Sequence, residues 1–155
     1  MKKFLKKIKP WHIASLTVTI VVFFVIRLVN LNGLPVFVDE AIYIRWAQIM
    51  RSEPTLRFLP LQDGKQPLFM WSMIPFFKLL KDPVIAGRVL SILAGLGTLL
   101  GLTTISYLLF SSLHLSLLVG LLYAITPYTV FFDRLALVDS MLAMFGVWSL
   151  VIGFL

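Results

Sequence analysis

The sequence has 155 residues, of which 59% are hydrophobic and 14% are charged, and its mean hydropathy is +0.96. A soluble globular domain carries about 25% charged residues, and an intrinsically disordered chain is poor in apolar residues. The composition therefore excludes both classes and predicts an integral membrane protein. The absence of cysteine excludes disulfides, and two histidines, His12 and His114, are too few for a histidine-rich metal site.

The net charge of +7 is concentrated at the N-terminus. Five of the fourteen basic residues stand in the first nine positions, and the other nine are nearly balanced by seven acidic residues. A basic segment beside an apolar run marks the cytoplasmic side of a membrane span, so no nucleic-acid partner is expected. We predict a cytoplasmic tail over residues 1–12 and a retained first span over residues 13–31, because no signal-peptide cleavage site follows the run. Arg27, near the end of this span, is expected to snorkel outward.

Residues 32–83 are predicted to form an outer loop with two juxtamembrane helices. Over residues 39–51, apolar and polar side chains lie on opposite sides of a helical wheel, which is typical of a helix in the membrane interface. Residues 68–80 are apolar but would cover only about 20 Å as a helix, whereas a span crosses about 30 Å. We interpret them as the second juxtamembrane helix. A short span is the alternative, and it would place Asp139 on the cytoplasmic side.

Two further spans are predicted over residues 84–110 and 115–132, since no charged residue stands between Arg88 and Asp133. Pro127 should bend the second of them, because proline cannot donate the backbone hydrogen bond of a helix.

A second outer loop, residues 133–139, precedes a fourth apolar run. Asp133 and Arg134 are interpreted as an adjacent charge pair at the end of a span. Residues 140–155 begin a span that no polar segment follows, so we expect the chain to be the N-terminal portion of a longer protein. The predicted fold class is an all-α membrane helix bundle of about four spans, with an outer-face loop carrying juxtamembrane amphipathic helices.

Polar residues stand in apolar surroundings in four short motifs: Val38-Asp39-Glu40-Ala41-x-Tyr43, Gly64-Lys65-Gln66-Pro67-Leu68-Phe69-x-Trp71, Ala86-Gly87-Arg88-Val89-Leu90-Ser91 and Asp133-Arg134-x-Ala136-Leu137-x-Asp139. Charges beside a membrane core usually mark a pathway or a site. In this order, the motifs resemble those of the GT-C type glycosyltransferases that use polyprenyl-phosphate-linked sugars. That group includes the protein O-mannosyltransferases and the aminoarabinose transferases of lipid A. Gln66 replaces a family proline, and Val138 replaces a threonine.

The resemblance implies inverting transfer of a sugar from a polyprenyl-phosphate donor to a glycan, lipid or protein acceptor at the outer face of the plasma membrane. It implies catalytic roles for three acidic residues, Asp39, Glu40 and Asp139. It also implies contacts with the donor phosphate for three basic residues, Lys65, Arg88 and Arg134. Asp39 and Asp139 could hold a divalent metal ion, and no other cofactor is implied. The fragment by itself is expected to be inactive.

The same residues also have purely structural interpretations. Asp39 and Asp139 could be helix N-caps, Glu40 could offset a helix dipole, and Lys65 could be an interfacial lysine. A second class of function therefore stays open: a small non-enzymatic membrane protein that binds or translocates a polyprenyl-phosphate lipid. Such a protein would not need Asp39 as a base.

Overall fold

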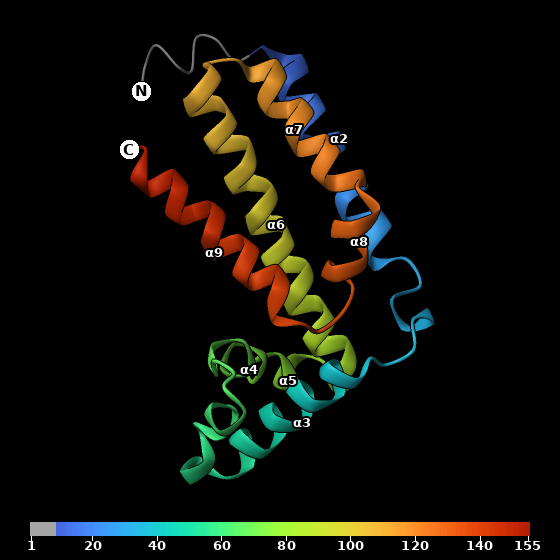
Figure 1. The fold of residues 1–155 in the computed structure, drawn as a ribbon. Helices are drawn as coiled ribbons and strands as arrows, with labels where there is room; N and C mark the ends of the chain where they lie inside the picture. The colour runs from blue at the N-terminus through green and yellow to red at the C-terminus, as the bar shows by residue number, and fades with distance from the viewer. Residues whose placement is uncertain (1–8) are drawn as a thin grey trace.

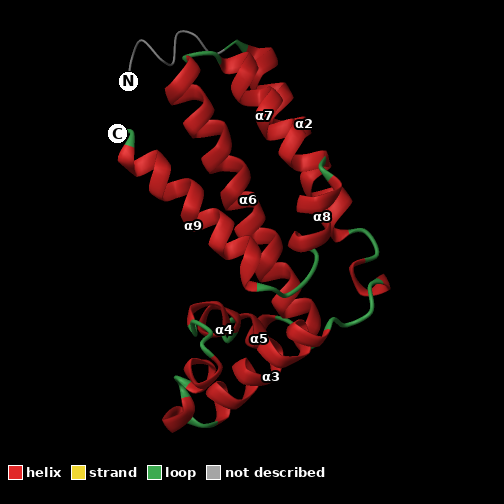
Figure 2. Cartoon of the chain, viewed as in Figure 1, coloured by secondary structure: helices red, strands yellow, loops and turns green. Residues whose placement is uncertain are grey.

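A computed structural model describes residues 9–155, and every regular element within that range is helical (Figures 1 and 2). The membrane bundle consists of α2 (Pro10–Leu28), α6 (Pro83–Phe110), α7 (Leu113–Ile125), α8 (Pro127–Asp133) and α9 (Val138–Gly153). A 3-10 turn at Leu31–Gly33 follows α2. The predicted all-helical bundle is therefore confirmed. The basic tail predicted over residues 1–12 lies outside the described residues except for its last four positions.

A second group of helices lies across one end of the bundle, and we call it the α3–α5 layer (Figure 1). It consists of α3 (Val38–Ser52), 3-10 turns at Pro54–Leu56 and Leu59–Asp63, α4 (Leu68–Met73) and α5 (Phe76–Leu79). The layer is at the end where α6 and α9 begin, opposite the end where α2 begins. The apolar segment that the sequence places over residues 68–80 is divided into α4 and α5 at Pro75, which cannot donate a helical hydrogen bond.

Two described helices are long and apolar enough to cross a membrane: α2 with the residues up to Gly33, and α6. α7 and α8 make a third candidate if they form one span bent by 62°. The bend is at Pro127, which confirms the kink predicted there. α9 is apolar but has only 16 residues, about 24 Å of helix. The described residues therefore contain two or three candidate spans, where the sequence predicts about four.

Two buried hydrophobic clusters hold the helices together. One lies inside the bundle and is formed by Phe23, Ile92, Leu99 and Ala124. The larger one joins the α3–α5 layer to the bundle. Its buried members are Tyr43, Ile44, Ala47 and Met50 of α3, Phe69, Met70 and Met73 of α4, Leu90 and Ala94 of α6, and Leu135, Ala136, Leu137 and Met141 around the start of α9. This second cluster fixes the layer against the helix ends that carry the charged motifs.

Candidate functional site

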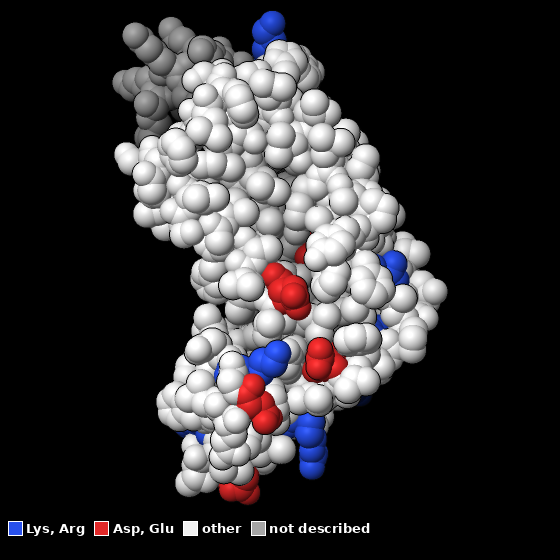
Figure 3. Space-filling model, in the orientation of Figure 1, with Lys and Arg blue, Asp and Glu red and all other residues white. Residues whose placement is uncertain are grey.

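The charged residues gather where the α3–α5 layer meets the bundle, and the face of the bundle seen in Figure 3 carries few of them. The structure divides Arg27 and the charged residues of the four motifs into two main groups, with Arg134 intermediate in exposure. Four are buried and form two ion pairs, Glu40 with Arg88 and Arg27 with Asp133. Three residues of the motifs are exposed, namely Asp39, Lys65 and Asp139. This division separates the residues that hold the structure from those that can meet a ligand.

Glu40 and Arg88 form a bidentate ion pair in the interior. The Arg88 Nε donates to Glu40 Oε1 at 2.8 Å, and Arg88 Nη2 donates to Glu40 Oε2 at 2.8 Å. Glu40 is 0% exposed and Arg88 is 1% exposed. Removing two charges from water is costly, and paired geometry of this kind is what offsets the cost. Neither side chain presents an open face to a substrate.

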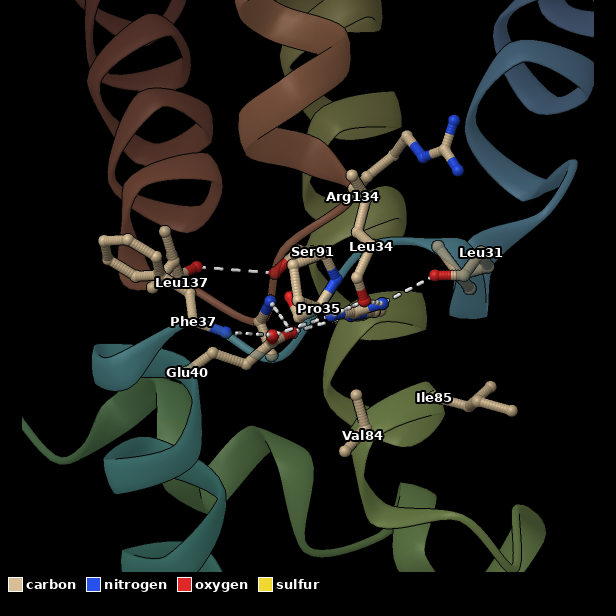
Figure 4. A network of polar contacts seen from close by, with 12 residues as sticks. Leu31, Leu34, Pro35, Phe37, Glu40, Val84, Ile85, Ser91, Arg134 and Leu137 are labelled. Carbon is tan, nitrogen blue, oxygen red and sulfur yellow. Dashed lines mark hydrogen bonds and ion pairs between the residues drawn. The ribbon is translucent and has the colours of Figure 1, made fainter.

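The Glu40 carboxylate also joins two segments that are distant in the sequence. It accepts hydrogen bonds from the backbone N–H of Phe37, the N-cap of α3, at 3.2 Å and from that of Ala136 at 2.8 Å (Figure 4). Burial raises the pKa of Glu40, but the hydrogen bonds from Arg88, Ala136 and Phe37 and the positive charge of Arg88 together outweigh burial and hold that pKa below its ordinary value. Glu40 therefore fastens the start of α3 to the loop that precedes α9.

Arg88 completes this junction by binding the chain between α2 and α3. Its Nη1 donates to the carbonyl oxygen of Leu31 at 2.6 Å, and both Nη atoms donate to that of Leu34 at 3.2 Å. A carbonyl group buried without a partner would destabilise the fold. The Arg88 guanidinium therefore stabilises the irregular segment between α2 and α3 as well as the negative charge of Glu40.

The second buried pair links α2 to α8. Arg27 Nε donates to Asp133 Oδ2 at 2.9 Å, and Arg27 is 0% exposed. The same carboxylate accepts hydrogen bonds from the hydroxyl groups of Tyr123 at 3.1 Å and Ser140 at 2.7 Å. The prediction that Arg27 snorkels outward is therefore wrong, because the bundle supplies a buried counter-charge from a residue 106 positions away.

Arg134 does not form the predicted pair with its neighbour Asp133. Its Nη atoms donate to the carbonyl oxygens of Ile26, Val29 and Asn30, at 3.2, 3.0 and 2.8 Å. These carbonyls belong to the end of α2, where a helix has no partners of its own for its last C=O groups. Figure 4 shows the Arg134 side chain pointing away from the Glu40 network. Arg134 thus closes the end of a helix in the described structure.

Asp39 and Asp139 occupy equivalent positions in two helices. Each is the second residue of its helix, and the N-caps of α3 and α9 are Phe37 and Leu137. The interpretation of the two aspartates as N-caps is therefore wrong. Both are exposed, and among the described residues neither carboxylate has a hydrogen-bond or ion-pair partner.

The Glu40 network brings the first turns of α3 and α9 to the same place. Asp39 adjoins Glu40, and Glu40 is bonded to Ala136, which precedes Asp139 by three residues. The N-terminus of a helix carries a partial positive charge, which stabilises a carboxylate in its first turn. The structure therefore presents two exposed carboxyl groups, without partners among the described residues, on neighbouring helix starts.

Lys65 lines a pocket of about 330 Å³ between the α3–α5 layer and α9. Gly64, with a φ of 68°, turns the chain just before it, and the Lys65 N–H donates to the Pro60 carbonyl at 3.0 Å. The other residues lining the pocket are Gly64, Gln66, Leu68, Phe69, Val138, Met141, Leu142 and Phe145. The pocket thus combines two polar side chains, Lys65 and Gln66, with an apolar wall that is mostly α9.

A family model for dolichyl-phosphate-mannose-protein mannosyltransferase matches residues 61–153, which is more than half of the chain. The chain belongs to this family. It is accordingly a member of the membrane glycosyltransferases of the GT-C type, as the four motifs indicated. No curated protein and no solved structure matches the chain. The part of this mannosyltransferase-family chain that matches contains Lys65 and Asp139, whereas Asp39 precedes it.

The donor set at this site restricts how a mannosyltransferase-family chain could hold a metal ion. No group of three or more His, Cys, Asp or Glu side chains that could bind a metal occurs within residues 9–155. Asp39 and Asp139 supply two carboxylates. Mg²⁺ is commonly bound by one or two carboxylates together with water and substrate phosphates, so the residues fit such an ion and do not fit an all-protein cage.

Sequence reasoning missed both buried ion pairs in this mannosyltransferase-family chain. It assigned Glu40 and Arg88 to chemistry, and it treated Arg27 and Asp133 separately. One signal was available: an ionisable residue inside a span generally has a partner, so Arg27 called for an acid elsewhere in the bundle. Asp133, at the end of another span, was a natural candidate.

Proposed function

We propose that this chain forms a site at which a sugar passes from a polyprenyl-phosphate donor to an acceptor hydroxyl or phosphate, with inversion at the anomeric carbon. The observation that carries the proposal is the exposure of Asp39 and Asp139, without partners among the described residues, at helix starts held in place by a buried network. The pocket at Lys65 adds a site for the donor. The acceptor would be a glycan, a lipid or a protein.

The side chains that line the pocket at Lys65 suit a lipid that carries a phosphate group. A lysine ammonium is a point charge that binds phosphate oxygens, and Lys65 has no counter-ion among the described residues. The apolar side chains of α9, including Met141 and Phe145, continue the pocket along a membrane helix. A polyprenyl chain would lie against them while its phosphate contacts Lys65.

In the proposed transfer, Asp39 accepts the proton of the acceptor hydroxyl as its oxygen forms a bond to the anomeric carbon. The bond between that carbon and the donor phosphate oxygen breaks, and the polyprenyl phosphate leaves with the electron pair. Lys65 stabilises the negative charge on the leaving phosphate. A phosphate leaving group is already a stable anion, so the site does not need a strong general acid.

The carboxylate of Asp139 would orient the acceptor or share a divalent cation with Asp39. Bound there, such a cation would neutralise phosphate charge. In this proposal Glu40, Arg88 and Arg134 act as positioning residues. Glu40 and Arg88 bond each other, Glu40 also accepts from backbone N–H groups, and the arginines donate to backbone carbonyls.

The proposal is tested by measuring sugar transfer in membranes that contain the whole protein. Asp39→Asn should lower the rate by about 10²- to 10⁴-fold, the usual contribution of a general base. Glu53→Gln is the matched control, since Glu53 is an exposed acid at the opposite end of α3. An Asp39→Asn protein that is stable and retains full activity would refute the role of Asp39.

The donor site has a separate test. Lys65→Ala should reduce the rate by about 10²-fold, the usual cost of losing one electrostatic contact to the developing charge. The loss of rate should vary with the concentration of the polyprenyl-phosphate donor and not with that of the acceptor. Donor binding without any transfer by the wild-type protein would instead favour the non-enzymatic lipid-binding function.

The proposed orientation puts the N-terminus in the cytoplasm and the α3–α5 layer on the outer side of the membrane. The chain contains no cysteine, so single cysteines can report the side on which a residue lies. Ser52→Cys in α3 should react with a membrane-impermeant thiol reagent added outside intact cells. Ser111→Cys, beside the other end of α6, should react only after the membrane is opened. The reverse pattern would overturn this orientation.

A further inference from the structure

The chain's two histidines meet at the end of the bundle opposite the α3–α5 layer. His12 is in the first turn of α2 and His114 is in the first turn of α7. Their ring centroids are 5.4 Å apart, and the ring of Trp11 is 3.7 Å from that of His12 and 4.8 Å from that of His114. The proposed transfer site uses none of these residues.

The hydrogen bond made by His12 determines which of its ring nitrogens is a donor. The Lys9 backbone N–H donates to His12 Nδ1 at 2.9 Å, so Nδ1 is unprotonated and the neutral ring carries its proton on Nε2. His12 is only 7% exposed, and Nε2 has no acceptor among the described residues. An N–H donor without a protein partner is available to a ligand that offers an acceptor.

A pocket of about 390 Å³ at this end is lined by hydrogen-bond donors. Lys9, His12, His114 and the hydroxyl-bearing Ser111 contribute to it, together with Trp11. All seven acidic residues of the chain stand elsewhere, within residues 39–82 or at positions 133 and 139. Lys9 therefore has no acidic neighbour in the sequence or in the described structure, and the pocket fits an anion.

A second pocket, of about 330 Å³, adjoins the first and shares His12 and Leu113 with it. It is lined mainly by apolar side chains of α2 and α7, such as Ile13, Leu16 and Leu117, with part of α6. Because α2 and α6 are candidate spans, this groove extends from the bundle end into the membrane region. A polar pocket that continues into an apolar groove has the shape of a phospholipid with a head group and an acyl chain.

We propose that this end of the bundle binds one anionic glycerophospholipid, whose phosphate contacts Lys9, His12 Nε2 and His114 and whose acyl chain occupies the groove beside Leu16. Trp11, which is 43% exposed, would be at the head-group depth where tryptophan is enriched. Four further lysines precede Lys9 in the sequence and add attraction to an anionic leaflet. The site lies at the opposite end of the bundle from the proposed donor pocket, so it does not depend on the transfer reaction.

Native mass spectrometry of the whole purified protein can count bound lipids. With dioleoyl-phosphatidylglycerol and dioleoyl-phosphatidylcholine as probes, we expect one phosphatidylglycerol to bind about tenfold more tightly than phosphatidylcholine. Lys9→Ala and His114→Phe should each weaken that binding about fivefold, the effect of losing one cationic or donor contact at a membrane surface. Leu16→Trp should weaken it by filling the groove. Lys81→Ala, which removes an exposed lysine beside the start of α6, is the matched control and should leave it unchanged.

Equal binding of the two phospholipids by the wild-type protein would overturn the proposal, and this comparison needs no variant to fold. Displacement of phosphatidylglycerol by inorganic phosphate would assign the pocket to a free anion. Displacement by a stoichiometric amount of polyprenyl phosphate would assign it to the carrier lipid. Either displacement would also overturn the proposal as stated.

Discussion

Replacing Glu40 by glutamine should release the α3–α5 layer from the bundle. The Glu40 carboxylate accepts four hydrogen bonds, two from Arg88 and one each from the backbone of Phe37 and Ala136. A glutamine has only one oxygen, so at least one of these donors would face its amide NH₂ group. Arg88 would in addition keep a buried charge that cannot deprotonate. Breaking one partner of a buried pair costs about 3–5 kcal/mol.

Hydrogen–deuterium exchange of the α3 amides measures this cost directly. A loss of 3–5 kcal/mol in the free energy of opening corresponds to exchange that is about 10²- to 10³-fold faster, since each 1.4 kcal/mol is a factor of ten. Glu53→Gln should change the exchange less than about twofold, because substitutions at exposed positions usually cost under about 0.5 kcal/mol. Equal protection of α3 in Glu40→Gln and in the wild type would refute the role we give to the pair.

A double substitution at Glu40 and Arg88 distinguishes the cost of one unpaired buried charge from the cost of losing the two side chains. Arg88→Met leaves the Glu40 carboxylate with its two backbone donors, and a carboxylate can take up a proton, so this variant should be less unstable than Glu40→Gln. Combining Glu40→Met with Arg88→Met removes both charges and should restore part of the loss. A double variant less stable than both Glu40→Gln and Arg88→Met would contradict this reasoning.

Three further predictions concern the same interior. Gly95→Ala should cost about 1–3 kcal/mol in thermal unfolding, because its Cβ would collide with the Asp133 carboxylate, whereas Gly146→Ala meets open space and should be neutral or stabilising. Arg134→Met should increase exchange at the end of α2 by about 10- to 100-fold, because three carbonyl groups lose their donor. The pKa of Glu40 is lowered in the folded chain, so the stability it contributes is complete above its unfolded pKa of about 4.3 and is lost as the pH falls through the folded value. Melting curves between about pH 3 and 6 should show this loss in the wild type and not in Glu40→Gln.

Local structure could be predicted well from the sequence where the pattern is strong. The amphipathic pattern predicts a helix over residues 39–51, and α3 runs from Val38 to Ser52. The long apolar run predicts a helix over residues 84–110, and α6 runs from Pro83 to Phe110. Both predictions depend on the hydrophobic periodicity or the length of a single segment, and no contact with another part of the chain is needed to recognise them.

The pairing of charges could not be predicted in the same way. Arg27 and Asp133 are 106 residues apart, and their contact depends on how α2 packs beside α8. Adjacent residues of a helix point about 100° apart, so one of Asp39 and Glu40 had to face away from the bundle. Which one does so depends on where α3 begins and how it is rotated, and neither is encoded in the motif itself.

This arrangement separates two demands that one carboxylate cannot meet. A residue that stabilises a fold has its lone pairs occupied by donors, as Glu40 does, whereas a general base must keep a lone pair free for the proton it accepts. In the proposed function, the chain uses neighbouring acids for the two tasks, and the buried Glu40 fixes the backbone that carries the exposed Asp39. Asp39→Asn should therefore lower transfer by about 10²- to 10⁴-fold while α3 keeps its protection from exchange. Glu40→Gln should lower transfer and protection together, and only the Glu40 variant should regain activity under conditions that stabilise the fold.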